Sequence, residues 1–348
     1  MEAVAGAHRV PPSKARMSNG ERSAAAHGIS VVVPVFNEAV LLDELRERLI
    51  GTLENLARDF EIILVDDGST DGSAERLDRI HEEDPRFRCV HLSRNFGHQA
   101  AVTAGLRYAS GDLVFVMDGD LQDPPEVLPS LIAEWEQGSD VVYGFRENRK
   151  EHWLLVTFYH LFYRLLARLS TVAIPLDAGD FCLMSRVVVD EINRLPEKDR
   201  FVRGLRTWVG FKQSAVRYDR GVRAGGESKY SLTDLFRLAV SGIVSFSDKP
   251  LIYVMIFGLL TSLAAFAYGA SLVVFTVVFG GVITGYASLM AGLLFLGGVQ
   301  LTSIGIVGIY LSTLFKEVKA RPTYIVASLR GLETIVPDGC GPAHEPVP

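Results

Sequence analysis

The chain has 348 residues, 48% of them hydrophobic, and a formal net charge of −6 at pH 7. A net negative charge argues against a nucleic-acid-binding protein. Three cysteines, odd in number and far apart, argue against a disulfide framework or a zinc site.

The first 28 residues differ from the rest of the chain. They contain Ala, Ser and Pro with scattered charges, and no apolar core that would mark a signal peptide. We therefore expect a disordered N-terminal tail over 1–28.

Strands and helices are predicted to alternate from Ile29 to Gly144. Apolar runs predict buried strands, and the segments between them carry helical spacing of apolar residues. The strands are expected over 29–36, 60–67, 87–93, 111–117 and 140–144. Such alternation predicts an α/β, Rossmann-like domain whose parallel strands are joined by crossover helices.

Acidic residues stand at the ends of three of these strands. The first strand leads to Glu38, the second to Asp66 and Asp67, and the fourth to Asp118 and Asp120. The carboxyl ends of parallel strands line one crevice, so we expect these side chains to share a site. Five carboxylates there repel one another unless a cation or a hydrogen-bonding ligand neutralises them. The sequence therefore predicts a divalent metal site.

No GxGxxG follows the first strand and no GxxxxGK[ST] occurs, so the usual dinucleotide and Walker phosphate loops are missing.

Membrane-associated segments are expected in the second half of the chain. Residues 153–169 are rich in Leu, Phe and Tyr, and fit either a core helix or an amphipathic helix on a membrane surface. A juxtamembrane amphipathic helix of similar character is expected over 231–250. From Leu251 to Phe315 there is no charged residue, which leaves room for two membrane-spanning helices, near 251–278 and 288–314.

Basic residues around this hairpin predict its orientation. Lys249 precedes the first span, Lys316, Lys319 and Arg321 follow the second, and the connecting turn has none. By the positive-inside rule, the large domain and both termini, including a tail over 316–348, are expected in the cytoplasm.

Four segments in order resemble a known family: VVPVFNE, VDDGSTDGS, MDGDLQDPPE and RAGGESKY. Together they resemble the inverting, nucleotide-sugar-dependent family 2 glycosyltransferases of GT-A fold, and within them the dolichyl- and polyprenyl-phosphate sugar synthases. The bacterial undecaprenyl-phosphate glucosyltransferase-like branch is the most similar. The resemblance covers Ile29 to Phe315 and implies a GT-A catalytic domain over 29–230, mostly a parallel sheet, followed by the two-helix transmembrane hairpin at 251–315.

The resemblance also implies which residues form the site. Mg²⁺ or Mn²⁺ is expected on Asp118, Asp120 and Gln122. Catalysis is implied for Asp120, and for Arg223 and Lys229 on a loop that closes over the diphosphate; without the motif, a solvated loop is the alternative. The nucleotide sugar is expected to contact Pro34, Phe36, Glu38, Val65, Asp67, Asp118, Gly119 and Arg146. Residues on the acceptor side are expected to be Asp180, Arg200, Arg203 and Arg206.

Two positions depart from the family pattern. Family members often have Tyr where Phe36 stands, and some have Ser-Gly-Phe where Gly179-Asp180-Phe181 stands, which leaves the role of Asp180 open. The arginines of 200–206 bind either the lipid phosphate or anionic headgroups.

The implied function is transfer of one hexose, glucose being favoured, from a nucleotide diphosphate sugar to a polyprenyl monophosphate, with inversion, at the plasma (inner) membrane. A UDP-sugar is favoured over a GDP-sugar. The acceptor phosphate is already ionised near neutral pH, so no general base is required, and His98 is expected to be structural. The expected partners also include membrane lipids and further copies of the chain, and no nucleic acid. The alternatives are a GDP-mannose enzyme of the dolichyl-phosphate mannose synthase type, a processive polysaccharide synthase, and a non-enzymatic scaffold.

Overall fold

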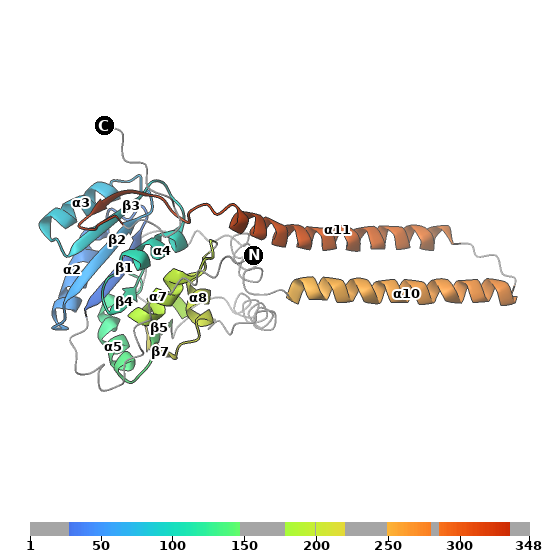
Figure 1. Cartoon of the computed structure of the whole chain (residues 1–348), viewed down its shortest axis with the longest axis horizontal. Coiled ribbons are helices and arrows are strands. Elements are labelled where there is room, and N and C mark those ends of the chain that lie inside the picture. Colours follow the sequence, from blue (N-terminus) through green and yellow to red (C-terminus); the bar gives the residue numbers. More distant parts are fainter. Residues whose placement is uncertain (1–27, 147–177, 199, 220–248, 280–284, 335–348) are drawn as a thin grey trace, which may run out of the picture. The chain divides into compact units, whose positions relative to one another are not determined.

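The computed structural model describes residues 28–146, 178–198, 200–219, 249–279 and 285–334 (Figure 1). They belong to two compact units: an α/β unit that includes 322–334, and a helical unit that includes 249–279 and 285–321. Several predicted segments lie outside the described residues, among them the N-terminal tail before Gly28, the helix over 153–169, and all but the last two residues of the juxtamembrane helix.

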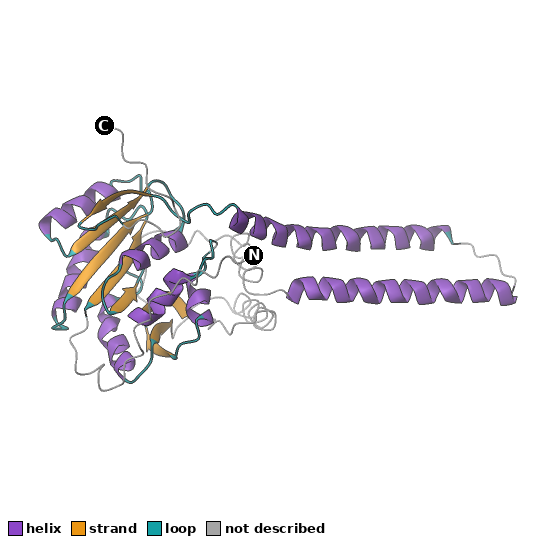
Figure 2. Cartoon of the chain, viewed as in Figure 1, coloured by secondary structure: helices purple, strands orange, loops and turns teal. Residues whose placement is uncertain are grey.

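Within the described residues, the α/β unit contains one eight-stranded sheet in the order β7-β5-β6-β4-β1-β2-β3-β8 (Figures 1 and 2). Strands β1 to β4 run parallel to one another, as predicted, and β5 runs parallel to β7. Strand β6 is antiparallel to β4 and β5, and β8 is antiparallel to β3. The strands are β1 (Ile29–Val35), β2 (Phe60–Asp66), β3 (Phe87–Leu92), β4 (Leu113–Val116), β5 (Val141–Arg146), β6 (Ala178–Ser185), β7 (Gln213–Tyr218) and β8 (Val326–Arg330).

Helices cover both faces of this sheet because both faces of the parallel strands are apolar. On one face, leucines of α2 (Leu42–Glu54) pack with apolar residues of α3 (Ser73–Glu83) and α5 (Leu128–Glu136). The short helix η1 (Pro125–Val127) leads into α5. On the other face lie α4 (His98–Tyr108), α7 (Arg186–Arg194) and α8 (Val202–Trp208). Helix α4 sits so close to β1 that a Cβ at Gly105 would be 2.2 Å from Cγ1 of Val32, which explains the glycine.

Three strands were not anticipated from the sequence. Strand β6 places Phe181 and Leu183 on one face and Cys182 and Met184 on the other, all buried, between β4 and β5. Strand β7 is short and half-exposed. Strand β8 lies within the segment expected to be a C-terminal tail, so the chain returns to the sheet after the apolar hairpin.

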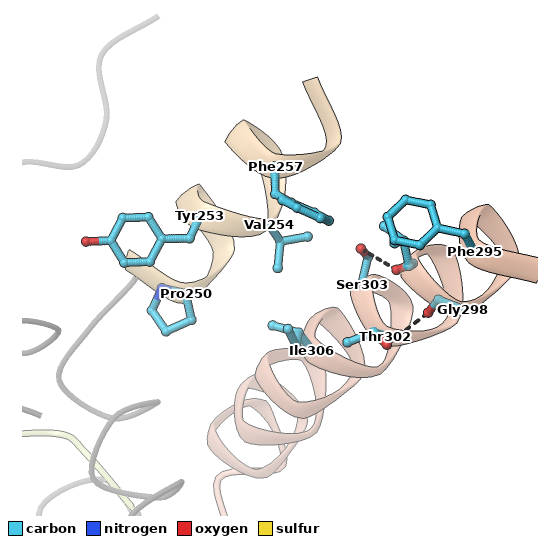
Figure 3. A pocket seen from close by; sticks show the side chains of 10 residues that line it. Pro250, Tyr253, Val254, Phe257, Phe295, Gly298, Thr302, Ser303 and Ile306 are labelled. Carbon is cyan, nitrogen blue, oxygen red and sulfur yellow. Dashed lines mark hydrogen bonds between the residues drawn. The ribbon is translucent and has the colours of Figure 1, made fainter. Parts of the chain in front are cut away.

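Among its described residues, the helical unit contains two long apolar helices, α10 (Lys249–Phe279) and α11 (Tyr286–Val318), in agreement with the two predicted spans. Both are long and apolar enough to cross a membrane. The two helices line a cleft of about 640 Å³ (Figure 3). In it, the hydroxyls of Thr302 and Ser303 donate to carbonyls of their own helix, those of Gly298 and Val299. These hydroxyls are therefore satisfied without water, as an apolar surrounding requires.

Candidate active site

A pocket of about 230 Å³ lies at the carboxyl ends of β1, β2 and β4, where the sequence predicted it. It brings together residues that are as much as 86 positions apart, from Pro34 to Asp120. Its walls are Pro34, Val35, Phe36, Glu38, Asp67, Asn95, Gly97, His98, Ala101, Asp118, Gly119 and Asp120.

The loops after β1 and β2 are joined by hydrogen bonds. The backbone N–H of Asn37 donates to Oγ of Ser69, and the Asn37 side chain accepts from the N–H of Thr70. The N–H of Glu38 donates in the same way to Oγ of Ser73. These contacts hold the Phe36 and Glu38 side of the pocket in a fixed position relative to Asp67.

Asp67 joins the second loop to the loop after β3. Its two carboxylate oxygens accept from the backbone N–H groups of Phe96 and Gly97, at 2.7 and 2.9 Å. Burial outweighs these bonds and raises the pKa of Asp67 above its ordinary value. Gly68, next in the chain, has φ +70°, and a Cβ there would lie 2.5 Å from the carbonyl carbon of Arg94. Only glycine fits where these two loops meet.

Asp118 and Asp120 form the acidic end of the pocket. Burial, together with the charges of Asp180 and Asp120, raises the pKa of Asp118 to about 6 even though His98 opposes the shift. Its Oδ1 atom is buried, with no hydrogen-bond partner among the described residues. Asp120 accepts from the N–H of Gln122, and Leu121 between them has φ +57°, an uncommon conformation for a branched residue.

This arrangement fits a divalent cation. Asp118 and Asp120 offer hard oxygen donors in the pocket lining, and Oδ1 of Asp118, which accepts no hydrogen bond from the described residues, is the kind of buried atom that a cation satisfies. Gln122 is 8% exposed and is not among the lining residues. Among the described residues no group of three or more His, Cys, Asp or Glu is positioned to enclose a metal ion.

His98 links the acidic pair to the predicted acceptor side. Its Nε2 atom lies 3.6 Å from Oδ1 of Asp118 and 3.3 Å from Oδ2 of Asp180. Burial lowers the pKa of His98, but the contacts with Asp180 and Asp118 raise it more. The same Oδ2 of Asp180 accepts from Nε2 of Gln99, whose Oε1 accepts from the N–H of Val202 at the start of α8.

The three predicted acceptor-side arginines occupy different environments. Nε of Arg203 lies 3.4 Å from Oδ1 of Asp180. Arg206 is 1% exposed, with its guanidinium over the ring of Tyr143 and no hydrogen-bond partner for Nε and Nη2 in the described part of the chain. Arg200 instead donates to the carbonyls of Leu195 and Glu197, so the structure does not bring it to Asp180.

The remaining predicted residues are not among those that the structure places in the pocket lining. The expectation that Asp66 shares the site is wrong: its carboxylate lies against His91, since alternate residues of a strand face opposite ways. The Val65 side chain is fully buried beside α4, which leaves only its backbone for a ligand. Arg146 ends β5, and its side chain is not described. Arg223 and Lys229 lie outside the described residues.

His98, set aside as structural from the sequence, is part of the pocket wall. Its position in the sequence could have indicated this role, because it begins the helix that follows β3. The end of β3 lies at the same edge of the sheet as Asp67 and Asp118. Asn95 and Gly97 enter the lining for the same reason.

Comparison with known proteins identifies a family and close relatives of this chain. Residues 30–192 match Glycosyl transferase family 2. An uncharacterized glycosyltransferase, sll0501, of Synechocystis sp. (strain ATCC 27184 / PCC 6803 / Kazusa) is 43% identical over 306 residues, which cover 88% of this chain and 96% of the relative. The SfII prophage-derived bactoprenol glucosyl transferase of Shigella flexneri is 41% identical over 299 residues, 86% of this chain and 97% of the relative. A mannosyltransferase from Pyrobaculum calidifontis, solved with GDP-Man and Mn²⁺, overlaps with a TM-score of 0.43 at 17% identity, over 85% of this chain and 88% of that one. The low TM-score means that this structural similarity carries no argument about function.

Proposed function

The chain belongs to glycosyl transferase family 2, and we propose that it transfers one glucose from UDP-glucose to a polyprenyl monophosphate of the bactoprenol type, with inversion. The observation that carries the proposal is that Asp67, Asp118 and Asp120 line one pocket. The proposal is also supported by the relatives that match this chain over almost their whole length, which include a bactoprenol glucosyl transferase. A non-enzymatic scaffold needs no such pocket.

The nucleoside end of the donor is assigned to the β1 and β2 side of the pocket. Phe36 is 44% exposed and offers a ring face for stacking on a base. Asp67 and Glu38 supply carboxylate acceptors for N–H or ribose O–H groups. Because Phe36 has no hydroxyl, recognition of the base rests on these acceptors and on backbone groups.

The diphosphate is assigned to the acidic end. Asp118, Asp120 and Gln122 would hold Mg²⁺ or Mn²⁺, which when bound supplies neutralising charge to the leaving nucleoside diphosphate. Arg223 and Lys229 are proposed to add cations from the later loop. Gly119 lies between the two carboxylates, and a Cβ there would lie 3.2 Å from the Pro34 carbonyl oxygen, so glycine lets this loop pass close to β1.

The acceptor is assigned to the side formed by His98, Asp180 and Arg203. A phosphate oxygen attacks the anomeric carbon on the face opposite UDP; the new C–O bond forms as the bond to UDP breaks, and UDP leaves with the electron pair. The phosphate is ionised near neutral pH, so the protein has to position it rather than deprotonate it. Asp180 fixes His98 and Arg203, and the Arg203 guanidinium compensates the charge of the approaching anion.

Membrane topology follows from the order of the chain. The α10–α11 hairpin stands between β7 and β8, which belong to one sheet, and a sheet is not divided by a bilayer. Both hairpin ends are therefore proposed to face the compartment of the catalytic domain. Lys249, Lys316, Lys319 and Arg321 at those ends make that compartment the cytoplasm.

The test uses membranes containing the full chain, undecaprenyl phosphate, Mg²⁺ or Mn²⁺, and radiolabelled UDP-glucose, UDP-galactose or GDP-mannose in parallel. We expect β-linked glucosyl lipid from α-linked UDP-glucose. Mannosyl lipid from GDP-mannose alone would assign the enzyme to the mannose synthase type, and water-soluble polymer would assign it to the processive synthases. The homo-oligomer remains a prediction, which light scattering of the detergent-solubilised protein tests.

A further inference from the structure

A chain of ionisable side chains, exposed at Arg330 and buried at His91 and Asp66, runs from the edge strand β8 to the start of the donor loop. Its centre is His91 on β3, which is 7% exposed. Nδ1 of His91 lies 3.2 Å from Oδ2 of Asp66, and Nε2 lies 3.1 Å from Oδ1 of Asp78 on α3. On the outer side, Arg330 of β8 donates to both oxygens of Asp78, at 2.9 and 3.0 Å.

The inner end of this chain fixes the loop that carries Asp67. The other oxygen of Asp66, Oδ1, accepts from the N–H of Ser69 at 2.9 Å, so one carboxylate closes the turn around Asp67 and Gly68. The turn has little freedom to compensate for a shift, because a Cβ at Gly68 would already overlap the backbone of Arg94. A displacement of Asp66 therefore displaces Asp67.

The segment that follows the second apolar helix is attached to the same region by a second contact. The N–H of Ser93, at the start of the loop that binds Asp67, donates to the carbonyl of Ile325 at 2.9 Å. The strand that follows, β8, then pairs with β3, where Ser328 stands opposite His91. The donor loop is thus supported by chain that lies beyond the apolar hairpin.

We propose that His91 is a positioning residue for the nucleotide sugar, and that Arg330 anchors it through Asp78, so that strand β8 forms part of the support of the donor site. None of the three touches the pocket; they act through Asp66 and the turn that it closes. The inference rests on the proposed function in one respect, that the Asp67 loop binds the nucleotide.

The protonation of His91 follows from its neighbours. Both ring nitrogens face carboxylate oxygens, which only accept, so both nitrogens have to donate. Burial lowers the pKa of His91, but Asp66 and Asp78 outweigh burial and raise it. The other titratable neighbours do not titrate near neutral pH, since the pKa of Asp66 is lowered and burial raises the pKa of Cys89 to about 12. As pH rises through the pKa of His91, the ring loses one donor and one of the two bridges breaks.

The test compares four variants of the full-length protein in detergent by titration calorimetry with UDP and, separately, GDP, in the presence of Mg²⁺. His91→Phe removes both bridges, and His91→Asn retains a donor near the Nδ1 position that reaches Asp66. Arg330→Ala removes the exposed anchor without disturbing the core. Arg86→Ala is the matched control, because Arg86 makes the same two-oxygen contact with Asp84 on the same unit but has no link to Asp66.

We expect the Kd of the bound nucleotide to rise about tenfold in His91→Phe, the equivalent of one charge-assisted hydrogen bond. His91→Asn should recover affinity only in part, to about the level of Arg330→Ala, because it restores the contact with Asp66 but not the one with Asp78. Arg330→Ala should raise the Kd about two- to fivefold, the range of an exposed ion pair, and Arg86→Ala should leave it unchanged. As pH rises through the pKa of His91, which lies above its ordinary value, nucleotide affinity should fall in the unmodified protein, and His91→Phe should lack this fall. In a transfer assay the loss should be in the KM for the donor, not in kcat.

Unchanged nucleotide affinity in both Arg330→Ala and His91→Phe would overturn the inference, as would equal weakening by Arg86→Ala. If His91→Phe does not fold, Arg330→Ala and the pH profile decide the matter. The calorimetry needs no lipid acceptor. Nucleotide binding without glucosyl lipid would therefore contradict the proposed function alone, whereas binding of neither nucleotide would contradict both.

Discussion

His98 and Asp180 form the contact that joins the two halves of the site: Nε2 of His98 lies 3.3 Å from Oδ2 of Asp180. The histidine opens α4, next to the donor pocket, and the aspartate lies near the start of β6, the antiparallel strand inserted between β4 and β5. The donor carboxylates come from the parallel strand ends, so this contact sets where an acceptor meets the donor. The chemistry proposed above depends on that placement.

Asp180→Asn should therefore impair transfer more than donor binding. The amide keeps the shape of the side chain but removes the charge that pairs with His98 and Arg203. We expect the rate of glucosyl-lipid formation to fall about 10- to 100-fold, the usual cost of misplacing a reactant, with UDP affinity retained.

The matched control is Asp190→Asn, which removes a carboxylate from a helix surface where it pairs with Arg186. Its transfer rate should equal that of the unmodified protein. Full transfer by Asp180→Asn, or loss of UDP binding together with transfer, would remove Asp180 from the acceptor side.

Gly68→Ala should destabilise the donor loop. An alanine at this position has to adopt φ +70°, and its Cβ overlaps the Arg94 backbone, whose atoms do not move aside easily. We expect a loss of about 1–3 kcal/mol in the free energy of unfolding and a higher KM for UDP-glucose.

Gly72→Ala separates the strain of a positive φ from the overlap with Arg94, because Gly72 has φ +91° but open space around its Cβ position. It should show the backbone strain alone, with a smaller loss of stability and an unchanged KM. Equal effects in the two variants, measured by thermal unfolding and initial rates, would show that loop contact at Gly68 is unimportant.

Much of this fold was predictable because it depends on local patterns. The apolar runs of β1 to β4 indicated a parallel sheet, and the position of acidic residues at strand ends indicated the pocket. The antiparallel strands β6 and β8 were not predictable, because their pairing joins segments far apart: Val90 of β3 lies opposite Leu329. Asp66 and Asp67 belong to different networks although they are adjacent, and the alternation of side chains along a strand could have separated them.

Glu61→Gln should lower stability without affecting the chemistry. Glu61 is buried at the opposite end of β2 from the pocket, where Oε1 accepts from Ser30 and Ser110 and Oε2 pairs with Arg88. Burial raises the pKa of Glu61, but these donors outweigh burial and hold it below its ordinary value. We expect the variant to lose about 2–4 kcal/mol at pH 7, the cost of removing one partner from a buried charged network.

The pH dependence of that loss has a definite sign. A lowered pKa in the folded state stabilises the fold above the unfolded pKa of about 4.3, and the contribution disappears as pH falls through the folded value. The difference in unfolding free energy between Glu61→Gln and the unmodified protein should therefore shrink below about pH 4. Glu44→Gln, an exposed carboxylate paired with Arg48, should show neither effect; a constant difference across pH would contradict the assignment.

The most direct test of the account is glucosyl-lipid formation from UDP-glucose and undecaprenyl phosphate by the unmodified protein and by Asp120→Ala, each with Mg²⁺, with Mn²⁺ and after treatment with EDTA. Glu126→Ala, which removes a carboxylate that pairs with Arg48 outside the pocket, is the control. We predict that the unmodified protein and Glu126→Ala form the product only with metal, and that Asp120→Ala forms almost none with either ion. Product formation by Asp120→Ala at the unmodified rate would contradict the assignment of Asp118 and Asp120 as the centre of the transfer site.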